Sequence, residues 1–390
     1  MTLCTSFLGR IMNDERLQQQ ATTMYGEALR GLSTTITAPN FYASDYVLAA
    51  VMCLGMAEVY SVPIQPAVDV GWASHNKGGC ELLVSRGPSI LRSELARGLL
   101  LRFRVTGVWT QLVYEASFLL KSGNKLYTAI GRRKPFPFAN PELRQISKSA
   151  NQNYYDNLMD AMVDIPGLLH DLNSMRQAAA GDHKKLRKGL EDILTRAKAI
   201  EAGLGQWLAG FVTQDRSAWH CVDGPPRPGA SIFPGTFRFR NLLAAQATTH
   251  FWAGLVILAR CYAMCQDLSK GTINIDQSVY GACMQLFKCS PLQTSSADAL
   301  IGLTGDPQAL GSHFADMICS AAGYFTSRDR GISGPIILLF PLWIAKDMYA
   351  NMMDEISRHK EVFCIGIFQE LASRGMKISD ALVSLSTKTP

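Results

Sequence analysis

The sequence is short of charge. Asp, Glu, Lys and Arg together make up 18% of its 390 residues, whereas apolar residues make up 47%. Because disordered chains are polar and highly charged, this composition excludes a disordered chain and indicates a soluble protein with a large buried core. The net charge of +6 is mild, and by itself it does not indicate a DNA-binding surface.

The sequence also lacks closely spaced cysteines. Its ten cysteines are scattered, and no two of them have the CxxC spacing. A zinc site needs closely spaced thiolates, and a disulfide framework needs a denser pattern in a shorter, secreted chain. We therefore predict reduced core thiols in an intracellular protein, with neither a metal nor a cofactor. Cys261 and Cys265, with Cys283 and Cys289 further on, could share a metal, but buried cysteines are the simpler interpretation.

Secretion signals and membrane-spanning runs are missing as well. The apolar stretch at the N-terminus is interrupted by Arg10, so it is too short for a signal peptide. Leu242–Cys265 contains Arg260, and Ile336–Ala345 has only ten residues, one of which is Pro341. A span needs roughly 20 apolar residues. Both stretches are therefore predicted to be buried helices, and no membrane contact is expected.

Four common catalytic motifs do not occur. The sequence has no G-x-S-x-G elbow, no H-E-x-x-H, no G-x-x-x-x-G-K-[ST] phosphate loop and no G-x-G-x-x-G. Their absence argues against the common hydrolases and nucleotide-driven enzymes. It does not exclude a cyclase or an isomerase, which can work by shaping a pocket and placing one or two acid–base groups.

Helical periodicity is what the sequence does have. Apolar residues recur at three- and four-residue steps, as Tyr25, Leu29, Leu32 and Ile36 do within Leu17–Ile36. Ser44 with Asp45 offers an N-cap for the next helix, and Gly87 with Pro88 ends a third. Further helical stretches are Ser93–Leu120, Glu142–Gln177, Lys184–Phe211, and Phe239 to Leu385 with breaks. No sustained strand alternation is present.

These patterns predict an all-α protein of antiparallel-packed helices. We expect a single domain over residues 1–390, because helix pairs with short links usually pack antiparallel. Gly131–Pro141 is a basic, proline-containing loop. Asp223–Gly235 contains four prolines and three glycines, so this Pro/Gly-rich loop at about 223–235 is the one internal position where two lobes could be joined.

Three stretches carry a family resemblance. The first is Met24–Leu32, continued by Ser44–Ala50 up to Glu58; the second is Gly71–His75, Gly78–Leu83 and Arg86-Gly87-Pro88; the third is Gly334–Ala345. In this order, over roughly 320 residues, they resemble the regulatory domain of fungal zinc-cluster transcription factors. The resemblance implies a large helical scaffold that mediates regulation, contacts with partner proteins and sensing of small-molecule effectors.

The zinc cluster that precedes this domain in family members is not found in the sequence. Cys4 stands alone, and the next cysteine is Cys53. The resemblance therefore implies a transcriptional regulator without its own DNA-binding module, located in the nucleus and linked to a secondary-metabolite gene cluster. Its partners would be proteins or a small-molecule effector, with no direct DNA binding; a homodimer is left open. A truncated or inactive family member is a further alternative.

An enzyme is the main alternative function. Three predicted helices each carry a pair of candidate pocket residues: Trp72 with His75, Trp109 with Tyr114, and His250 with Trp252. Aromatic walls with a few polar groups are typical of ligand sites, and a histidine near neutrality is a natural proton carrier. The scaffold could then be a cytoplasmic, cofactor-independent cyclase or isomerase that uses His75 and His250. Otherwise these aromatics fill the core and the histidines bond to the backbone.

Acidic and basic runs offer weaker signals. Asp156, Asp160 and Asp164 would share one helical stripe and could hold Mg²⁺ with a diphosphate, although a solvated acidic face explains them better. The basic clusters Arg132–Lys134 and Lys184–Lys188 could act as nuclear import signals, although solvated surface is the more ordinary interpretation.

A second acidic set has the spacing of a metal motif of terpene cyclases. It consists of Asp354, Ser357 and Glu361. Met353 replaces the usual Asn and has no oxygen ligand, so the set is interpreted as an ordinary charged surface turn.

Overall fold

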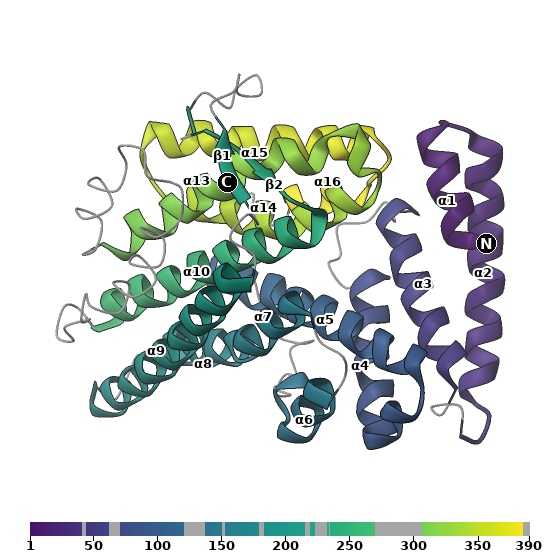
Figure 1. Ribbon diagram of the computed structural model, residues 1–390, viewed down its shortest axis with the longest axis horizontal. Coiled ribbons are helices and arrows are strands. Elements are labelled where there is room, and N and C mark those ends of the chain that lie inside the picture. Colours follow the sequence, from purple (N-terminus) through teal and green to yellow (C-terminus); the bar gives the residue numbers. More distant parts are fainter. Residues whose placement is uncertain are drawn as a thin grey trace. The chain divides into compact units, whose positions relative to one another are not determined.

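The structure is a computed structural model that describes residues 1–40, 44–61, 71–120, 137–149, 153–178, 183–214, 219–222, 232–233, 235–269 and 306–384. Nearly all regular structure in these residues is α-helical (Figure 1), which confirms the predicted all-α fold class. The chain divides into two compact units. The first unit comprises Met1–Gln111, Asn124–Gln152 and Gly366–Pro390, and the second comprises Leu112–Gly123 and Asn153–Ile365.

The first unit is built mainly from N-terminal helices. Its elements are α1 (Thr2–Ile11), α2 (Glu15–Ile36), α3 (Asp45–Ser61), α4 (Trp72–Arg86), the 3-10 helix η2 (Gly87–Arg92), most of α5 (Glu94–Leu120), η4 (Pro137–Ala139), α6 (Pro141–Ser149) and α16 (Ile378–Ser384). Asp14 begins α2 because its side chain accepts hydrogen bonds from the backbone of Arg16 and Leu17. Gly87 ends α4 with φ +51°, a left-handed conformation that glycine adopts without strain.

The second unit is arranged around α10 (Leu242–Ser269). The other elements are α7 (Tyr154–Met162), α8 (Ile165–Ala178), α9 (His183–Gln214), β1 (Trp219–Val222), β2 (Thr236–Phe239), α13 (Pro307–Thr326), η6 (Arg328–Arg330), α14 (Ser333–Ala350) and most of α15 (Glu355–Ser373). Helix α10 packs against α7, α8, α9, α13 and α14, so it forms the core of this unit. Most of its residues are buried, including Trp252 and Tyr262.

Helix α10 is the one described helix that is long and apolar enough to cross a membrane by length and composition, but 83% of its most apolar window is buried inside the protein. Helix α14 is also buried over most of its length, with Pro341 inside it. Both apolar stretches are therefore core helices, as the sequence predicts.

Two predictions about organisation differ from the structure. The region Glu142–Gln177 is not one helical run but α6, α7 and α8. Two short antiparallel strands, β1 and β2, flank the Pro/Gly-rich loop, pairing Trp219 with Phe239 and Val222 with Thr236. Four residues per strand are too few to show alternation in the sequence. The loop lies within the second unit, so the division between the units falls elsewhere.

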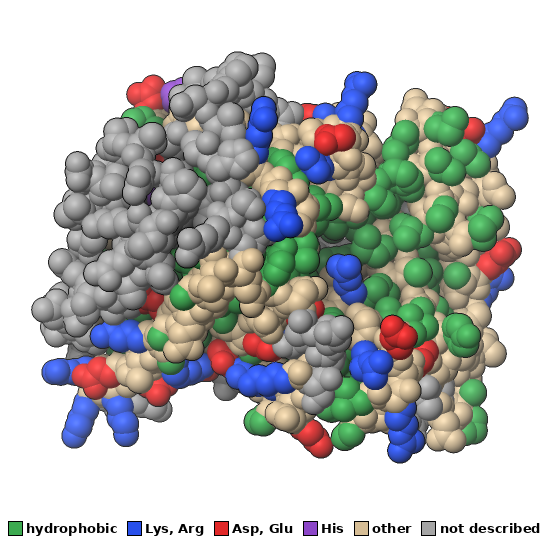
Figure 2. Space-filling model, in the orientation of Figure 1, with side chains coloured by type: hydrophobic (Ala, Val, Ile, Leu, Met, Phe, Trp, Pro, Cys, Tyr) green, Lys and Arg blue, Asp and Glu red, His purple; other side chains and the backbone are tan. Residues whose placement is uncertain are grey.

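Helix α2 forms where the periodicity predicts it, but its apolar stripe is not buried. Leu29 and Ile36 are exposed, and Ala21 is the one buried residue of this helix. Helix α1 also presents apolar side chains to solvent. Figure 2 shows hydrophobic side chains gathered on the surface over α1 and α2.

Candidate functional site

Three helices of the first unit bring together a tyrosine, a glutamate and a histidine. Tyr25 comes from α2, Glu58 from α3 and His75 from α4. The Tyr25 hydroxyl donates a hydrogen bond to Glu58 Oε1, and it also lies 2.9 Å from His75 Nε2. The Tyr25 and His75 rings meet edge to face, with centroids 6.3 Å apart. We call these three residues the Tyr25 cluster.

Two glycines make this close approach possible. A Cβ at Gly55 of α3 would lie 3.2 Å from His75 Cβ and 3.9 Å from Trp72 Cδ1, so both α4 side chains rest on this glycine. Gly71, the N-cap of α4, has φ +53°, and a Cβ there would overlap the Glu58 carboxylate. Glu58 therefore lies against the N-terminus of α4, where the helix dipole favours a negative charge.

The hydrogen bonds fix the proton positions in the Tyr25 cluster. Because Tyr25 gives its one proton to Glu58, His75 Nε2 must donate to the Tyr25 oxygen. Burial lowers the pKa of His75, although the nearby Glu58 charge opposes this shift, so the imidazole is neutral at neutral pH. Burial and the bond to Glu58 raise the pKa of Tyr25, which keeps its proton.

The cluster has hydrogen-bonding capacity left for a ligand. All three side chains are half-buried, so solvent reaches them. The described residues supply no further partner for Glu58 Oε2 or His75 Nδ1, and both atoms are acceptors. The arrangement can therefore bind a group that donates hydrogen bonds, or it can pass a proton along Glu58, Tyr25 and His75.

An ion pair joins the start of α3 to the end of α4. Arg86 at the end of α4 lies 2.6 Å from Asp45 at the start of α3, and Ser93, just before α5, donates to the same carboxylate. Burial alone would raise the pKa of Asp45, but the bonds from Ser93 and Arg86 hold it below its ordinary value. Asp45 and Arg86 are therefore charged partners that tie three helix ends together.

The sequence-predicted site residues are divided between the two units. Trp72 and His75 lie together in the first unit, where Trp109 on α5 is buried. The side chain of Tyr114 lies outside the described residues. Trp252 belongs to the second unit, where it is fully buried with its ring 5.1 Å from that of Phe237, as a core residue.

His250 is a buried residue of the second unit. Its Nδ1 lies 2.7 Å from the Gln246 carbonyl oxygen, to which it donates as a neutral ring. The rings of Tyr155 and Phe340 pack against it. Burial lowers the pKa of His250 to about 3, although the bond to Gln246 opposes the shift. A group with this pKa is poorly suited to carry protons near neutrality.

One residue of each acidic set caps a helix. Asp156 is buried and forms a capping box with Asn153 at the start of α7. Helix α7 ends at Met162, so Asp164 is not on it and the predicted common stripe of three carboxylates is wrong. Asp354 Oδ1 accepts a bond of 2.8 Å from the Ser357 backbone at the start of α15.

Metal-binding groups are not brought together in the part of the chain that is described. No three His, Cys, Asp or Glu side chains are close enough there to hold a metal ion. The described cysteines are all free thiols: Cys80, Cys261, Cys265, Cys319 and Cys364 are buried as predicted, whereas Cys4 and Cys53 are exposed. The side chain of Cys221, as well as Cys283, Cys289 and Arg132–Lys134, lie outside the described residues.

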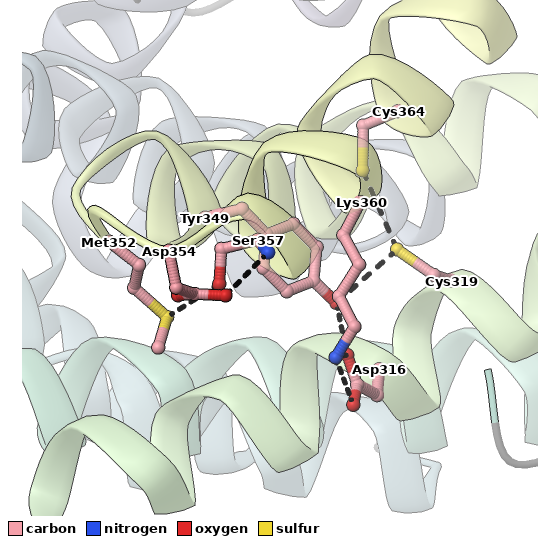
Figure 3. A network of polar contacts seen from close by, with 8 residues as sticks. All are labelled: Asp316, Cys319, Tyr349, Met352, Asp354, Ser357, Lys360 and Cys364. Carbon is pink, nitrogen blue, oxygen red and sulfur yellow. Dashed lines mark hydrogen bonds and ion pairs between the residues drawn. The ribbon is translucent and has the colours of Figure 1, made fainter. Parts of the chain in front are cut away.

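A second polar network lies in the second unit (Figure 3). Tyr349 donates to Asp316 Oδ1 at 2.7 Å, and Lys360 binds Asp316 Oδ2 at 2.8 Å. Both carboxylate oxygens are therefore engaged, so the network joins α13, α14 and α15 and leaves little capacity for a ligand. Beside it the Sγ atoms of Cys319 and Cys364 are 3.5 Å apart.

Sequence reasoning identified Trp72 and His75 but missed Tyr25 and Glu58 as site residues. Both belong to the first of the three resembling stretches, and this is the signal that could have found them. Their sequence separations, 33 residues between Tyr25 and Glu58 and 50 between Tyr25 and His75, hide the contact from local pattern analysis.

Comparisons with known proteins give little beyond this geometry. No protein-family model matches the chain. No solved structure matches it either. An uncharacterized protein of Emericella nidulans is 30% identical over 118 residues, which is 30% of this chain and 24% of that protein. A likeness over so small a share of both chains does not place this chain in a family.

Proposed function

We propose that this chain is a transcriptional regulator of the fungal zinc-cluster type, in which the Tyr25 cluster binds a small-molecule effector. The supporting observation is that the cluster joins two of the three resembling stretches. Tyr25 and Glu58 come from the first stretch and His75 from the second, and the Asp45–Arg86 pair joins the same two stretches. The proposal concerns the regulatory part of such a protein, with protein partners and no direct DNA contact.

The chemistry of the cluster favours an effector that donates hydrogen bonds. Glu58 Oε2 and His75 Nδ1 are acceptors, and Trp72 packs against Gly55 together with His75. A hydroxyl or amino group on an aromatic or unsaturated ring would bond to these acceptors while its ring contacts the indole. Such groups are common among secondary metabolites, which agrees with a regulator of a biosynthetic gene cluster.

The proposal is tested in the organism that encodes the chain. Deletion should reduce the transcripts of a gene cluster for a secondary metabolite, and a fluorescent fusion should accumulate in the nucleus. Unchanged transcripts in the deletion strain, or a fusion excluded from the nucleus, would count against a regulator.

An enzyme is the second candidate, and the proton-relay geometry of the Tyr25 cluster favours it. A neutral His75 that donates to Tyr25 could accept a proton at Nδ1 from a substrate, as a cyclase or isomerase requires. Purified protein would be incubated with the pathway intermediate, without cofactor, and the products separated by mass spectrometry. Under this alternative the wild type forms product and His75→Ala does not, whereas the exposed-histidine control His359→Ala keeps full activity.

A further inference from the structure

Two buried thiols of the second unit are almost in contact. Cys319 lies on α13 and Cys364 on α15, and their Sγ atoms are 3.5 Å apart (Figure 3). Both side chains are buried, with exposures of 2% and 0%. A disulfide bond is about 2.05 Å long, so the two sulfurs would have to approach each other by roughly 1.5 Å to be joined.

A tyrosine hydroxyl and a lysine charge lie near the pair. The Tyr349 hydroxyl lies 3.8 Å from Cys319 Sγ. Burial raises the pKa of Cys364 well above its ordinary value, and the bond to Cys319 raises it further, whereas the charge of Lys346 opposes the shift. In the closed fold the Cys364 thiol is therefore protonated and protected from bulky reagents, and it becomes reactive when the fold opens locally.

We propose that Cys319 and Cys364 are a redox modification site that forms a reversible disulfide with a small two-electron oxidant such as hydrogen peroxide. One thiol is oxidised to a sulfenic acid as peroxide is reduced to water. The second thiol then attacks that sulfur, forms the S–S bond and releases a second water. Two thiols and one hydrogen peroxide thus give one disulfide and two waters, and a dithiol reductant reverses the change.

The position of Cys364 gives the bond a structural consequence. Residue Ile365 is the last of the second unit, and Gly366 returns the chain to the first unit within the same helix, α15. A bond from Cys364 to α13 would fix α15 within the second unit directly before this crossing. The two cysteines are separate from the Tyr25 cluster, so the disulfide proposal does not depend on the proposed effector.

The test is peptide mapping of the folded, full-length protein. The protein is treated with hydrogen peroxide, quenched with catalase, alkylated and digested without reductant. We expect a linked peptide pair containing Cys319 and Cys364, which disappears after treatment with dithiothreitol. Cys80 is buried too, so Cys80→Ser serves as the matched control and should still give the linked pair, whereas Cys319→Ser should not.

The wild-type map decides the proposal even if a variant fails to fold. The proposal is overturned if the exposed Cys4 and Cys53 are oxidised while Cys319 and Cys364 stay reduced and are recovered fully alkylated. It is equally overturned if either of the two is found linked mainly to another cysteine.

Discussion

His250 and Glu201 are buried ionisable residues whose pKa values are displaced in opposite directions. Burial lowers the pKa of His250 to about 3 and raises that of Glu201 to about 8, against a bond from Tyr262 and the charge of Lys198. Each group is therefore neutral inside the fold over much of the pH range. In the unfolded chain, by contrast, each ionises near its ordinary pKa.

His250 should make the protein sensitive to acid. Its folded pKa is below its ordinary value of 6.5, so the unfolded state binds the proton first as pH falls. The contribution of neutral His250 to the free energy of unfolding is fully present above pH 6.5. It is lost as pH falls toward 3, by up to roughly 4 kcal/mol. Urea unfolding between pH 7 and 4 should show a shallower fall for His250→Gln. The exposed control His359→Gln should match the wild type; equal slopes for all three would contradict the assignment.

Glu201 should act in the opposite sense at higher pH. Its folded pKa lies above the ordinary 4.5, so its stabilising contribution is present below pH 4.5 and lost as pH rises through 8. The loss is up to roughly 4 kcal/mol. Glu201→Gln should therefore be more stable than the wild type at pH 9 in thermal unfolding. Glu191→Gln, exposed on the same helix, should leave this pH dependence unchanged. A wild-type stability that does not fall from pH 6 to 9 would refute the role of Glu201.

Among the helices, α4 depends on one close approach to α5. A Cβ at Gly79 would overlap the ring of Phe103, which is fully buried on α5. Because neither helix has room to move within the core, Gly79→Ala should destabilise the protein by about 1–3 kcal/mol.

The neighbouring glycine supplies a matched control. A Cβ at Gly78 would meet nothing within 4 Å, so Gly78→Ala should be neutral or stabilising by up to about 1 kcal/mol, through its helix propensity. Chemical denaturation of both variants measures the difference. If Gly79→Ala and Gly78→Ala had equal free energies of unfolding, the close contact between Gly79 and Phe103 would be contradicted.

The helices are predictable from sequence where apolar periodicity is sustained, as for α2, α3 and α9. The start of α7 does carry a local sequence signal, because Asn153 and Asp156 form a capping box within residues of weak helix propensity. The exposure of the α2 stripe could not be predicted, because periodicity shows that residues share a face, but not what that face contacts.

At the scale of the whole molecule, the all-α fold class follows from composition and periodicity, whereas the division into units does not. The chain leaves the first unit after Gln111, returns to it at Asn124, and returns again at Gly366. Local sequence patterns do not show where the chain returns to an earlier unit. For the same reason Trp72 and His75 could be chosen from sequence as neighbours on one helix, whereas Tyr25 and Glu58 required the fold.

The central claim is that the Tyr25 cluster controls transcription. The most direct measurement is transcript sequencing of strains that carry His75→Gln or Glu58→Gln, beside a deletion strain and the control His359→Gln, with protein abundance checked by immunoblotting. We predict that both cluster variants reproduce the transcript loss of the deletion strain at normal protein abundance, and that His359→Gln matches the wild type. Wild-type transcripts in both cluster variants would contradict the claim.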